Sequence, residues 1–255
     1  CFKLVVRINI AYRNQDPDVS EELLHSRTNL SLIPHSKIAK CRSDGYLYFS
    51  EGILKLQLLS IPAMSPLFVS FNLLERRAKD SLFQQNLIKA VGIGKGRRPS
   101  VLDGTAGLGS DAFLMASTGS SVSLFERNAI IYELLIDGLM RYELKGSKES
   151  EISTRMHTEK RDFLQLKDIR RSFDVVYLDP MFPSAKKNSL SKRPMYYLQK
   201  FLQKEASDHE MLFLAKKIAA KRVVVKRAIH SPLLADYNAD LVYRGNSSRF
   251  DVYSV

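Results

Sequence analysis

The second half of the chain alternates short apolar, strand-like segments with longer helix-like ones, and this alternation limits the fold more than any other feature. The strand-like segments are residues 100–103, 121–126, 152–157, 173–179 and 222–226. The helix-like stretches between them include 104–118, which a glycine turn opens, 128–144, and two pieces within 195–220. Such an order is typical of a parallel sheet with helices on both faces. Residues 240–243 and 250–253 add a closing antiparallel hairpin, so we expect an α/β, doubly wound sheet over residues 100–255.

The first 71 residues differ from this pattern and predict a small α+β lobe. Strand-like segments lie at residues 2–10, 28–33, 46–49, 53–58 and 67–71, and Ser20 is a candidate N-cap of a short helix. Residues 72–99 predict a connecting helix, up to Val91, followed by a linker. No apolar run approaches the roughly 20 residues that span a bilayer, and Lys3 and Arg7 interrupt the N-terminal apolar segment. We therefore expect a cytoplasmic protein with no membrane span and no signal peptide.

Lys and Arg number 39 against 27 Asp and Glu, which gives a formal net charge of +12. Most of the excess lies in residues 181–230, which hold twelve basic residues and three acidic ones. A field of this sign attracts a polyanion such as a nucleic acid. A basic surface also serves as a solvated face that keeps a protein in solution, so charge alone leaves both interpretations open.

The first strand of the doubly wound sheet ends in Asp103 and leads into a glycine-rich turn, DGTAGLGSDAF. Gly104, Gly107 and Gly109 let the backbone turn tightly and approach a ligand, and the following helix offers free N–H groups. The second strand ends in Glu126, about 20 residues further on, where a carboxylate can accept both ribose hydroxyls of an adenosine. This spacing favours an adenosine cofactor, although some glycine turns after a strand are tight turns only.

Asp103 distinguishes between two adenosine cofactors. Its carboxylate would repel the pyrophosphate of a dinucleotide and attract the ammonium and sulfonium groups of S-adenosylmethionine. The third strand leads into Arg161-Asp162, where the acid could accept a hydrogen bond from the adenine amino group. Asp162 fits equally well as the N-cap of a short helix. The residues therefore favour S-adenosylmethionine and leave the role of Asp162 open.

The most specific chemical signal is the segment YLDPMFP, residues 177–183, at the end of the fourth strand. An exocyclic amine conjugated to a purine ring is a poor nucleophile, so an acceptor on its N–H must localise the lone pair as a methyl group approaches. Asp179 is the candidate acceptor, helped by the Pro180 carbonyl, and an aromatic such as Phe182 can stack on an extruded base. A rigid turn made by the two prolines is the structural alternative.

Basic residues follow this motif at once, in the sequence SAKKNSLSKRP. Lys186, Lys187, Lys192 and Arg193 would lie at the rim of the proposed pocket, where they could contact phosphates flanking the target base. We therefore expect this segment to contact nucleic acid. The five histidines and two cysteines share no metal-ligand spacing, so no metal site is expected.

Several segments together resemble the RsmJ family of bacterial small-subunit ribosomal RNA guanine-N2 methyltransferases: VLDGTAGLGSDAFLMAS, LFERN, FDVVYLDPMFPSAKK, KRVVVKR and RFDVY. The resemblance covers residues 67–255 well and the N-terminal lobe in outline. It implies a class I methyltransferase fold and the formation of N2-methylguanosine in 16S rRNA, free or in the small ribosomal subunit, from S-adenosylmethionine. By motif it implies cofactor contacts from Ser110, Asp111, Glu126, Arg127, Arg161, Asp162 and Asp179. The family tends to have Arg where this chain has Ser110.

Three other functions stay open on the sequence alone. A nicotinamide-dependent oxidoreductase would use a similar sheet, but Asp103 and the Asp179 motif argue against it. A non-catalytic RNA-binding module would explain the basic surface and leave the glycine turn unexplained. A methyltransferase for another exocyclic amine, adenine N6 or a different guanine in RNA or DNA, is distinguished only by the resemblance. The sequence carries no signal for oligomeric state.

Overall fold

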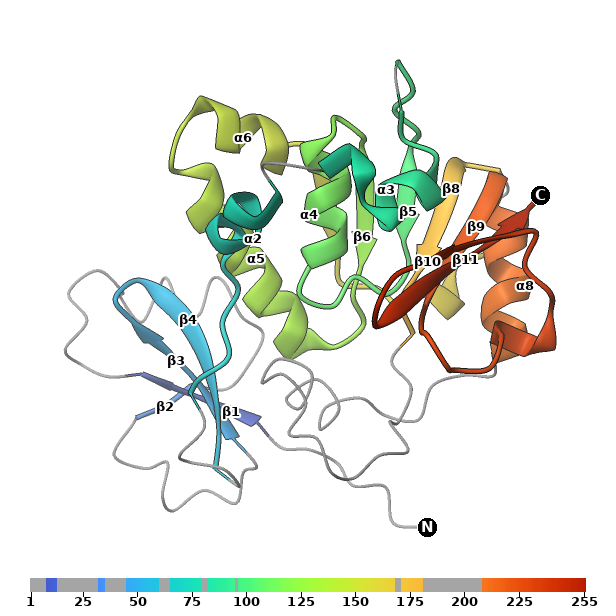
Figure 1. Ribbon diagram of the computed structural model, residues 1–255. Helices are drawn as coiled ribbons and strands as arrows, with labels where there is room; N and C mark the ends of the chain where they lie inside the picture. Colours follow the sequence, from blue (N-terminus) through green and yellow to red (C-terminus); the bar gives the residue numbers. More distant parts are fainter. Residues whose placement is uncertain are drawn as a thin grey trace, which may run out of the picture. The chain divides into compact units, whose positions relative to one another are not determined.

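The computed structural model describes residues 8–12, 32–34, 45–59, 65–78, 82–94, 96–167, 171–180 and 208–255 (Figure 1). The chain divides into two compact units, residues 1–69 with 183–202 and residues 70–182 with 203–255. The three segments expected from the sequence, 1–71, 72–99 and 100–255, stay a prediction. Among the helices described, none is both long and apolar enough to cross a membrane.

The smaller unit holds a four-stranded sheet in the order β2-β1-β3-β4. Its strands are β1 (Ile8–Tyr12), β2 (Leu32–Pro34), β3 (Gly45–Ser50) and β4 (Ile53–Leu58). β1 pairs in parallel with β2 and β3, whereas β3 and β4 form an antiparallel hairpin. Glu51 and Gly52 connect this hairpin with φ of 56° and 68°, the left-handed pair that a two-residue hairpin turn favours.

Four of the five predicted N-terminal strands overlap with these observed strands. The predicted strand at 67–71 is wrong, because Leu67 forms only an isolated bridge to Leu56 and Phe71 begins a helix. A short apolar run has no period that separates a strand from a buried helical turn, which explains the error. The helix expected after Ser20 lies outside the described residues.

The larger unit is built on a seven-stranded sheet in the order β10-β11-β9-β8-β5-β6-β7. Its strands are β5 (Val101–Asp103), β6 (Val122–Phe125), β7 (Met156–Glu159), β8 (Phe173–Leu178), β9 (Ala219–Ala228), β10 (Leu241–Arg244) and β11 (Ser248–Ser254). β5 to β9 are mutually parallel, and β11 is antiparallel to both β9 and β10. The chain runs outward from β5 to β7 and then returns to β8, so the strand order reverses between β5 and β8. The predicted doubly wound sheet with its closing hairpin is confirmed.

Helices cover both faces of this sheet (Figure 1). They are α2 (Phe71–Ala78), α3 (Asn86–Val91), α4 (Ser110–Ser117), α5 (Ala129–Glu143), α6 (Ser147–Ser153) and α8 (Asp208–Ile218), with the 3-10 turns η2 (Leu82–Gln84), η3 (Phe163–Gln165) and η4 (Leu234–Asp236). On one face, Ala215 of α8 shares a buried cluster with Val176 of β8 and Val225 of β9. Because strands buried on both faces lack polar alternation, they read in the sequence as continuous apolar runs.

On the other face, three aromatic rings join α2, α4 and α5. Phe71 stacks on Phe113 with ring centroids 4.9 Å apart, and the edge of Tyr142 meets both rings at 5.2 and 6.0 Å. All three side chains are buried. Stacked and edge-on rings at these distances stabilise the helical layer that supports the glycine turn before α4.

Two predicted elements are wrong in extent. The connecting helix expected over 72–91 is divided into α2 and α3, with η2 before α3. α3 ends at Val91 and is capped by Gly92, whose φ of 81° is the left-handed conformation that closes many helices. The strand expected at 152–157 begins only at Met156, because residues 147–153 form α6 and Ile152 is a buried residue of that helix.

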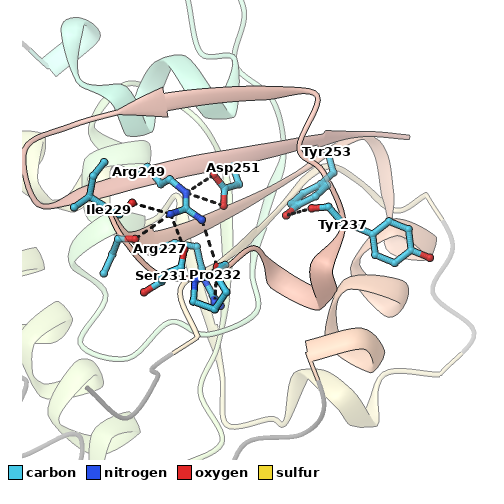
Figure 2. Close-up of polar contacts among 9 residues, drawn as sticks. Arg227, Ile229, Ser231, Pro232, Tyr237, Arg249, Asp251 and Tyr253 are labelled. Atoms are coloured by element: carbon cyan, nitrogen blue, oxygen red, sulfur yellow. Dashed lines mark hydrogen bonds and ion pairs between the residues drawn. The ribbon is translucent and has the colours of Figure 1, made fainter. Parts of the chain in front are cut away.

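A buried arginine anchors the loop that follows β9 (Figure 2). The Arg249 guanidinium, on β11, donates to the Asp251 carboxylate at 2.8 and 3.2 Å. It also donates, at 2.8 to 3.3 Å, to backbone carbonyls at and after the end of β9, those of Ala228, Ile229, Ser231 and Pro232. Arg227 donates to the Pro232 carbonyl as well, at 2.8 and 3.1 Å. Because Arg249 and Asp251 are 5% and 0% exposed, this ion pair holds the loop from inside the protein.

Candidate active site

The parallel strands of the larger sheet end at one edge, where most of the polar residues predicted from the sequence follow them. β5 ends in Asp103, β6 leads into Glu126, β8 leads into Asp179, and Lys226 lies near the end of β9. In open α/β sheets this edge binds ligands where the strand order reverses, which here is between β5 and β8. The N–H of Asp179 donates to Thr105 Oγ1 at 2.6 Å, so the end of β8 is tied to the glycine turn.

Two carboxylates close the glycine turn after β5. Asp103 Oδ1 accepts the Thr105 N–H at 3.1 Å. Glu126 Oε2 accepts the Gly107 N–H at 2.9 Å, and Glu126 Oε1 accepts the Asn128 N–H at 2.6 Å. Glu126 therefore links the end of β6 to the turn that follows the neighbouring strand.

Packing requires two of the glycines in this turn. A Cβ on Gly104 would lie 2.6 Å from the ring of Phe163, and a Cβ on Gly109 would lie 2.6 Å from Leu135 Cδ1. Gly109 also has a φ of 74° as the N-cap of α4, a conformation that other residues rarely adopt. A Cβ on Gly107 would meet no described atom nearer than 3.9 Å, so the backbone there is open to a ligand.

A lysine and a tyrosine join the predicted carboxylates at this edge. Lys226 Nζ lies 2.7 Å from Asp111 Oδ2 and 3.0 Å from Asp179 Oδ2. The Tyr177 hydroxyl donates to the same Asp111 oxygen at 2.6 Å. Asp103 is close enough for the charges of Asp111, Asp179 and Lys226 to act on it. These five residues, which we call the acidic cluster, hold three carboxyl groups and one ammonium group.

Burial and the charges of neighbouring groups shift the pKa values of the residues in this cluster. Burial raises the pKa of Asp103 well above its ordinary value; the Thr105 N–H opposes the rise, and Asp111 and Asp179 add to it. Burial also raises the pKa of Asp179, with Lys226 opposing and Asp111 adding. For Lys226, burial favours the neutral amine, but the two nearby carboxylates outweigh it and raise the pKa. A cationic ligand would relieve the repulsion among the carboxylates, so the cluster suits such a ligand.

Arg127, Arg161 and Asp162 lie together beside Glu126. The Arg161 N–H donates to the Glu126 carbonyl at 3.0 Å, and Arg127 Nη1 lies 4.0 Å from Asp162 Oδ2. Asp162 Oδ1 accepts the Leu164 N–H at 3.0 Å and caps η3. The alternative that Asp162 caps a short helix is confirmed, and its contact with adenine stays a prediction.

Part of the predicted site lies outside the described residues, namely Phe182, Lys186, Lys187, Lys192 and Arg193. Asp179 and Pro180 are described, and Ser110 is exposed as the first residue of α4. In the described part of the chain, no group of three or more His, Cys, Asp or Glu residues is placed to hold a metal ion.

Sequence reasoning missed Thr105, Tyr177 and Lys226. For Tyr177 and Lys226, the sequence offers only the alternation of side chains along a strand. Their neighbours Val176, Leu178 and Val225 belong to the core beneath α8, so Tyr177 and Lys226 face the other side of the sheet. This alternation places the two side chains near each other only once β8 and β9 are known to be neighbouring strands. Thr105 has no distinguishing signal within the turn.

The comparisons with known proteins agree with this geometry. A family model described as "Putative SAM-dependent methyltransferase" matches residues 31–255. The ribosomal RNA small subunit methyltransferase J of Dechloromonas aromatica is 42% identical over 209 residues, which cover 80% of this chain and 84% of that protein. The protein of the same name from Thioalkalivibrio sulfidiphilus is 36% identical over 253 residues, 97% of each chain. The chain belongs to the ribosomal RNA small subunit methyltransferase J family.

Membership in the methyltransferase J family decides the cofactor and the reaction class. S-adenosylmethionine is the cofactor and methyl transfer is the reaction, which excludes the nicotinamide-dependent alternative. The crystal structure of an S-adenosylmethionine-dependent methyltransferase from Neisseria gonorrhoeae matches with a TM-score of 0.72 and 28% identity, over 96% of this chain and 95% of that one. The expected class I methyltransferase fold is confirmed.

Proposed function

We propose that this chain transfers the methyl group of S-adenosylmethionine to the exocyclic N2 amine of a guanosine in 16S rRNA, free or in the small ribosomal subunit, in the cytoplasm. The position of Asp179-Pro180 carries the proposal. Because the Asp179 N–H is bound to Thr105 at 2.6 Å, a carboxylate acceptor lies beside the glycine turn. The names of the relatives support small-subunit ribosomal RNA as substrate, and the choice of the N2 amine follows the sequence resemblance.

The residues around the turn fit S-adenosylmethionine by charge and by hydrogen bonding. The acidic cluster, whose Asp103 side chain is buried, complements the ammonium and sulfonium groups. The Glu126 oxygens accept the Gly107 and Asn128 N–H groups, and the two oxygens of a carboxylate offer about four acceptor sites in all, which leaves capacity for a ribose hydroxyl. Asp162 Oδ2 is the proposed acceptor for the adenine amino group. Further contacts are proposed for Gly104, Gly107, Gly109, Ser110, Asp111, Arg127, Arg161 and Asp179.

In the proposed reaction, the lone pair of guanine N2 forms a bond to the methyl carbon as the carbon–sulfur bond breaks. Asp179 and the Pro180 carbonyl accept the amine N–H groups, and Phe182 stacks on the base. Transfer leaves a positive charge on the nitrogen, and one proton departs afterwards. Because burial raises the pKa of Asp179, its carboxylate is suited to receive that proton.

Replacing Asp103 with Asn is expected to weaken cofactor binding. The Asn side chain keeps an acceptor for the Thr105 N–H but carries no charge toward the cofactor. We expect S-adenosylmethionine to bind roughly 10- to 150-fold more weakly, which corresponds to the 1.5–3 kcal/mol typical of a hydrogen bond to a charged group. Calorimetric titration measures this difference, and an unchanged Kd would remove Asp103 from the cofactor site.

The same substitution is expected to stabilise the free protein at high pH. The pKa of Asp103 is higher in the folded chain than in the unfolded one, so the wild-type protein loses stability as the pH rises from about 4 through the folded pKa. The Asn variant lacks this loss. Its free energy of unfolding should exceed the wild-type value at pH 8, and the two should converge near pH 4. Urea titrations at both pH values measure the difference.

Changing Lys186 and Lys187 to Glu is expected to weaken RNA binding and flatten its salt dependence. Two lost phosphate contacts should reduce the slope of log Kd against log salt concentration by roughly 1.4 to 1.8. A matched control with the same change in charge is Lys89→Glu with Lys145→Glu, two exposed lysines outside the predicted rim. If both double variants show the wild-type slope, Lys186 and Lys187 belong to a solvated face.

The proposed function is tested by methyl transfer from isotope-labelled S-adenosylmethionine. The substrates are 16S rRNA and small subunits from a strain that lacks this protein, and the products are separated as nucleosides by mass spectrometry. Label in N2-methylguanosine is the expected result. Label in another nucleoside would leave the reaction class intact and overturn the choice of guanine N2.

A further inference from the structure

Lys226 brings an ammonium group into the acidic cluster, and the mechanism above gives it no role. Val223 and Val225 of β9 belong to the core beneath α8, so Lys226 projects to the opposite face of the sheet. On the neighbouring β8, Tyr177 lies between Val176 and Leu178 of the same core. Lys226 and Tyr177 therefore share a face, next to the first turn of α4.

Contacts on that face connect three elements of the fold. Lys226 Nζ is 2.7 Å from Asp111 Oδ2 of α4 and 3.0 Å from Asp179 Oδ2, just beyond β8. The side chains of Lys226, Asp111 and Asp179 are 27%, 19% and 38% exposed. Asp111 is also held by the Tyr177 hydroxyl at 2.6 Å. Of the side-chain contacts described for Asp179, the ion pair with Lys226 is the one that fixes its carboxylate.

We propose that Lys226 is a positioning residue for methyl transfer, which keeps the Asp179 carboxylate ionised and directed at the target amine. The inference rests on the function proposed above. Although the Asp179 side chain is 38% exposed, the protein atoms around its carboxylate and the charge of Asp111 both favour a proton on Asp179, and Lys226 opposes them. The other groups of the cluster, Asp103 on β5 and Tyr177 on β8, bring no positive charge. A protonated Asp179 would be a weaker acceptor for the amine N–H, because hydrogen bonds to an ionised acceptor are the stronger ones.

The test is the pH dependence of single-turnover methyl transfer by the whole chain with Lys226→Met. Without the ammonium, the pKa of Asp179 should rise, so the acidic limb of the rate profile should move up by roughly 1 to 3 pH units, the effect of one close opposite charge. The variant should be slow at low pH and recover toward the wild-type rate at high pH. Loss of stability alone would lower the amount of active protein without moving this limb upward.

Two controls separate charge from packing. Lys226→Arg keeps the positive charge, so its acidic limb should stay near the wild-type position even if orientation lowers the rate. Lys221→Met removes a lysine of the same strand whose Nζ lies 2.7 Å from Asp174 Oδ1, and it should leave the profile unchanged. If Lys226→Met is unfolded at the assay temperature, Lys226→Gln, which is neutral but keeps a polar N–H donor, is measured in its place.

The outcomes distinguish this inference from the proposed function. A folded neutral variant whose acidic limb coincides with that of the wild type overturns the role of Lys226, as does a Lys226→Arg limb that moves as far as the Lys226→Met limb. A wild-type chain that forms no N2-methylguanosine overturns the proposed substrate instead. If the wild type methylates another amine, the same profiles still decide whether Lys226 acts through Asp179.

Discussion

Replacing Asp179 with Ala is expected to abolish methyl transfer while the affinity for S-adenosylmethionine stays within a few-fold of the wild-type value. The carboxylate is the proposed acceptor for the target amine, and losing a group of this kind lowers rates by roughly 10²- to 10⁴-fold. Asp179 is tied to the glycine turn through its backbone N–H and Thr105, which Ala retains, so the turn should keep its shape. Labelled transfer and calorimetric cofactor titration measure the two quantities.

Asp174 provides a matched control on the same strand. It lies near the start of β8, where it accepts hydrogen bonds from the Ser100 N–H and hydroxyl at 3.0 and 3.2 Å and pairs with Lys221 at 2.7 Å. Asp174 lies far from the C-terminal end of β8, where the candidate site is. Asp174→Ala therefore removes a carboxylate outside the site and should leave turnover unchanged. Normal turnover by Asp179→Ala would remove this residue from the mechanism.

Arg249→Met is expected to lower the free energy of unfolding by about 3 to 5 kcal/mol, the usual cost of removing one partner from a buried ion pair. Asp251, at 0% exposed, would stay buried without its guanidinium. The carbonyls after β9 would lose the same donor. Because Met fills a similar volume, the decrease in the free energy of unfolding would come from the lost charge and hydrogen bonds more than from a cavity. Urea denaturation measures the change.

Two further variants show whether the effect belongs to the buried pair. Arg244→Met changes an exposed arginine of β10, directly across from Arg249, and should alter stability by less than about 0.5 kcal/mol. Arg249→Met combined with Asp251→Leu removes both charges and should recover part of the loss. A change below about 1 kcal/mol for Arg249→Met alone would contradict an anchoring role, since breaking a buried pair costs several times more.

The central strands could be predicted because their burial on both faces produces a recognisable run of apolar residues in the sequence. β5 and β8 are covered on both faces, so Val101-Leu102 and Val175-Val176 appear as uninterrupted apolar residues before a turn. The boundary between α6 and β7 could not be predicted, because Ile152 is buried whether it lies in a helix or in a strand. Local pattern decides an element's type only when the run is long enough to show a period.

The candidate site divides in the same way. Asp103, Glu126 and Asp179 could be predicted, because parallel strands end at a common edge and each residue follows a recognisable strand. Lys226 could not, since a lysine in RVVVKR is indistinguishable from one on a solvated face until β9 is placed beside β8. The burial of its neighbour Arg227, whose side chain is only 1% exposed, could not be predicted for the same reason. Part of the positive charge counted in residues 181–230 therefore lies inside the protein.

The place of β11 in the sheet has a consequence for the order of assembly. β11 follows β10 along the chain, yet it lies between β9 and β10, so β10 can join the sheet only through β11, either after it or together with it as a hairpin. Arg249 and Asp251, which hold the loop after β9, arrive with that same strand. Docking of β11 onto β9 closes loops of 20 to 32 residues, from Ser248 opposite Ala228 to Ser254 opposite Arg222, so the chain loses the entropy of loop closure before strand pairing compensates for it. The loop after β9, which lies beside the carboxyl edge of the sheet, is thus fixed in the same step that completes the sheet.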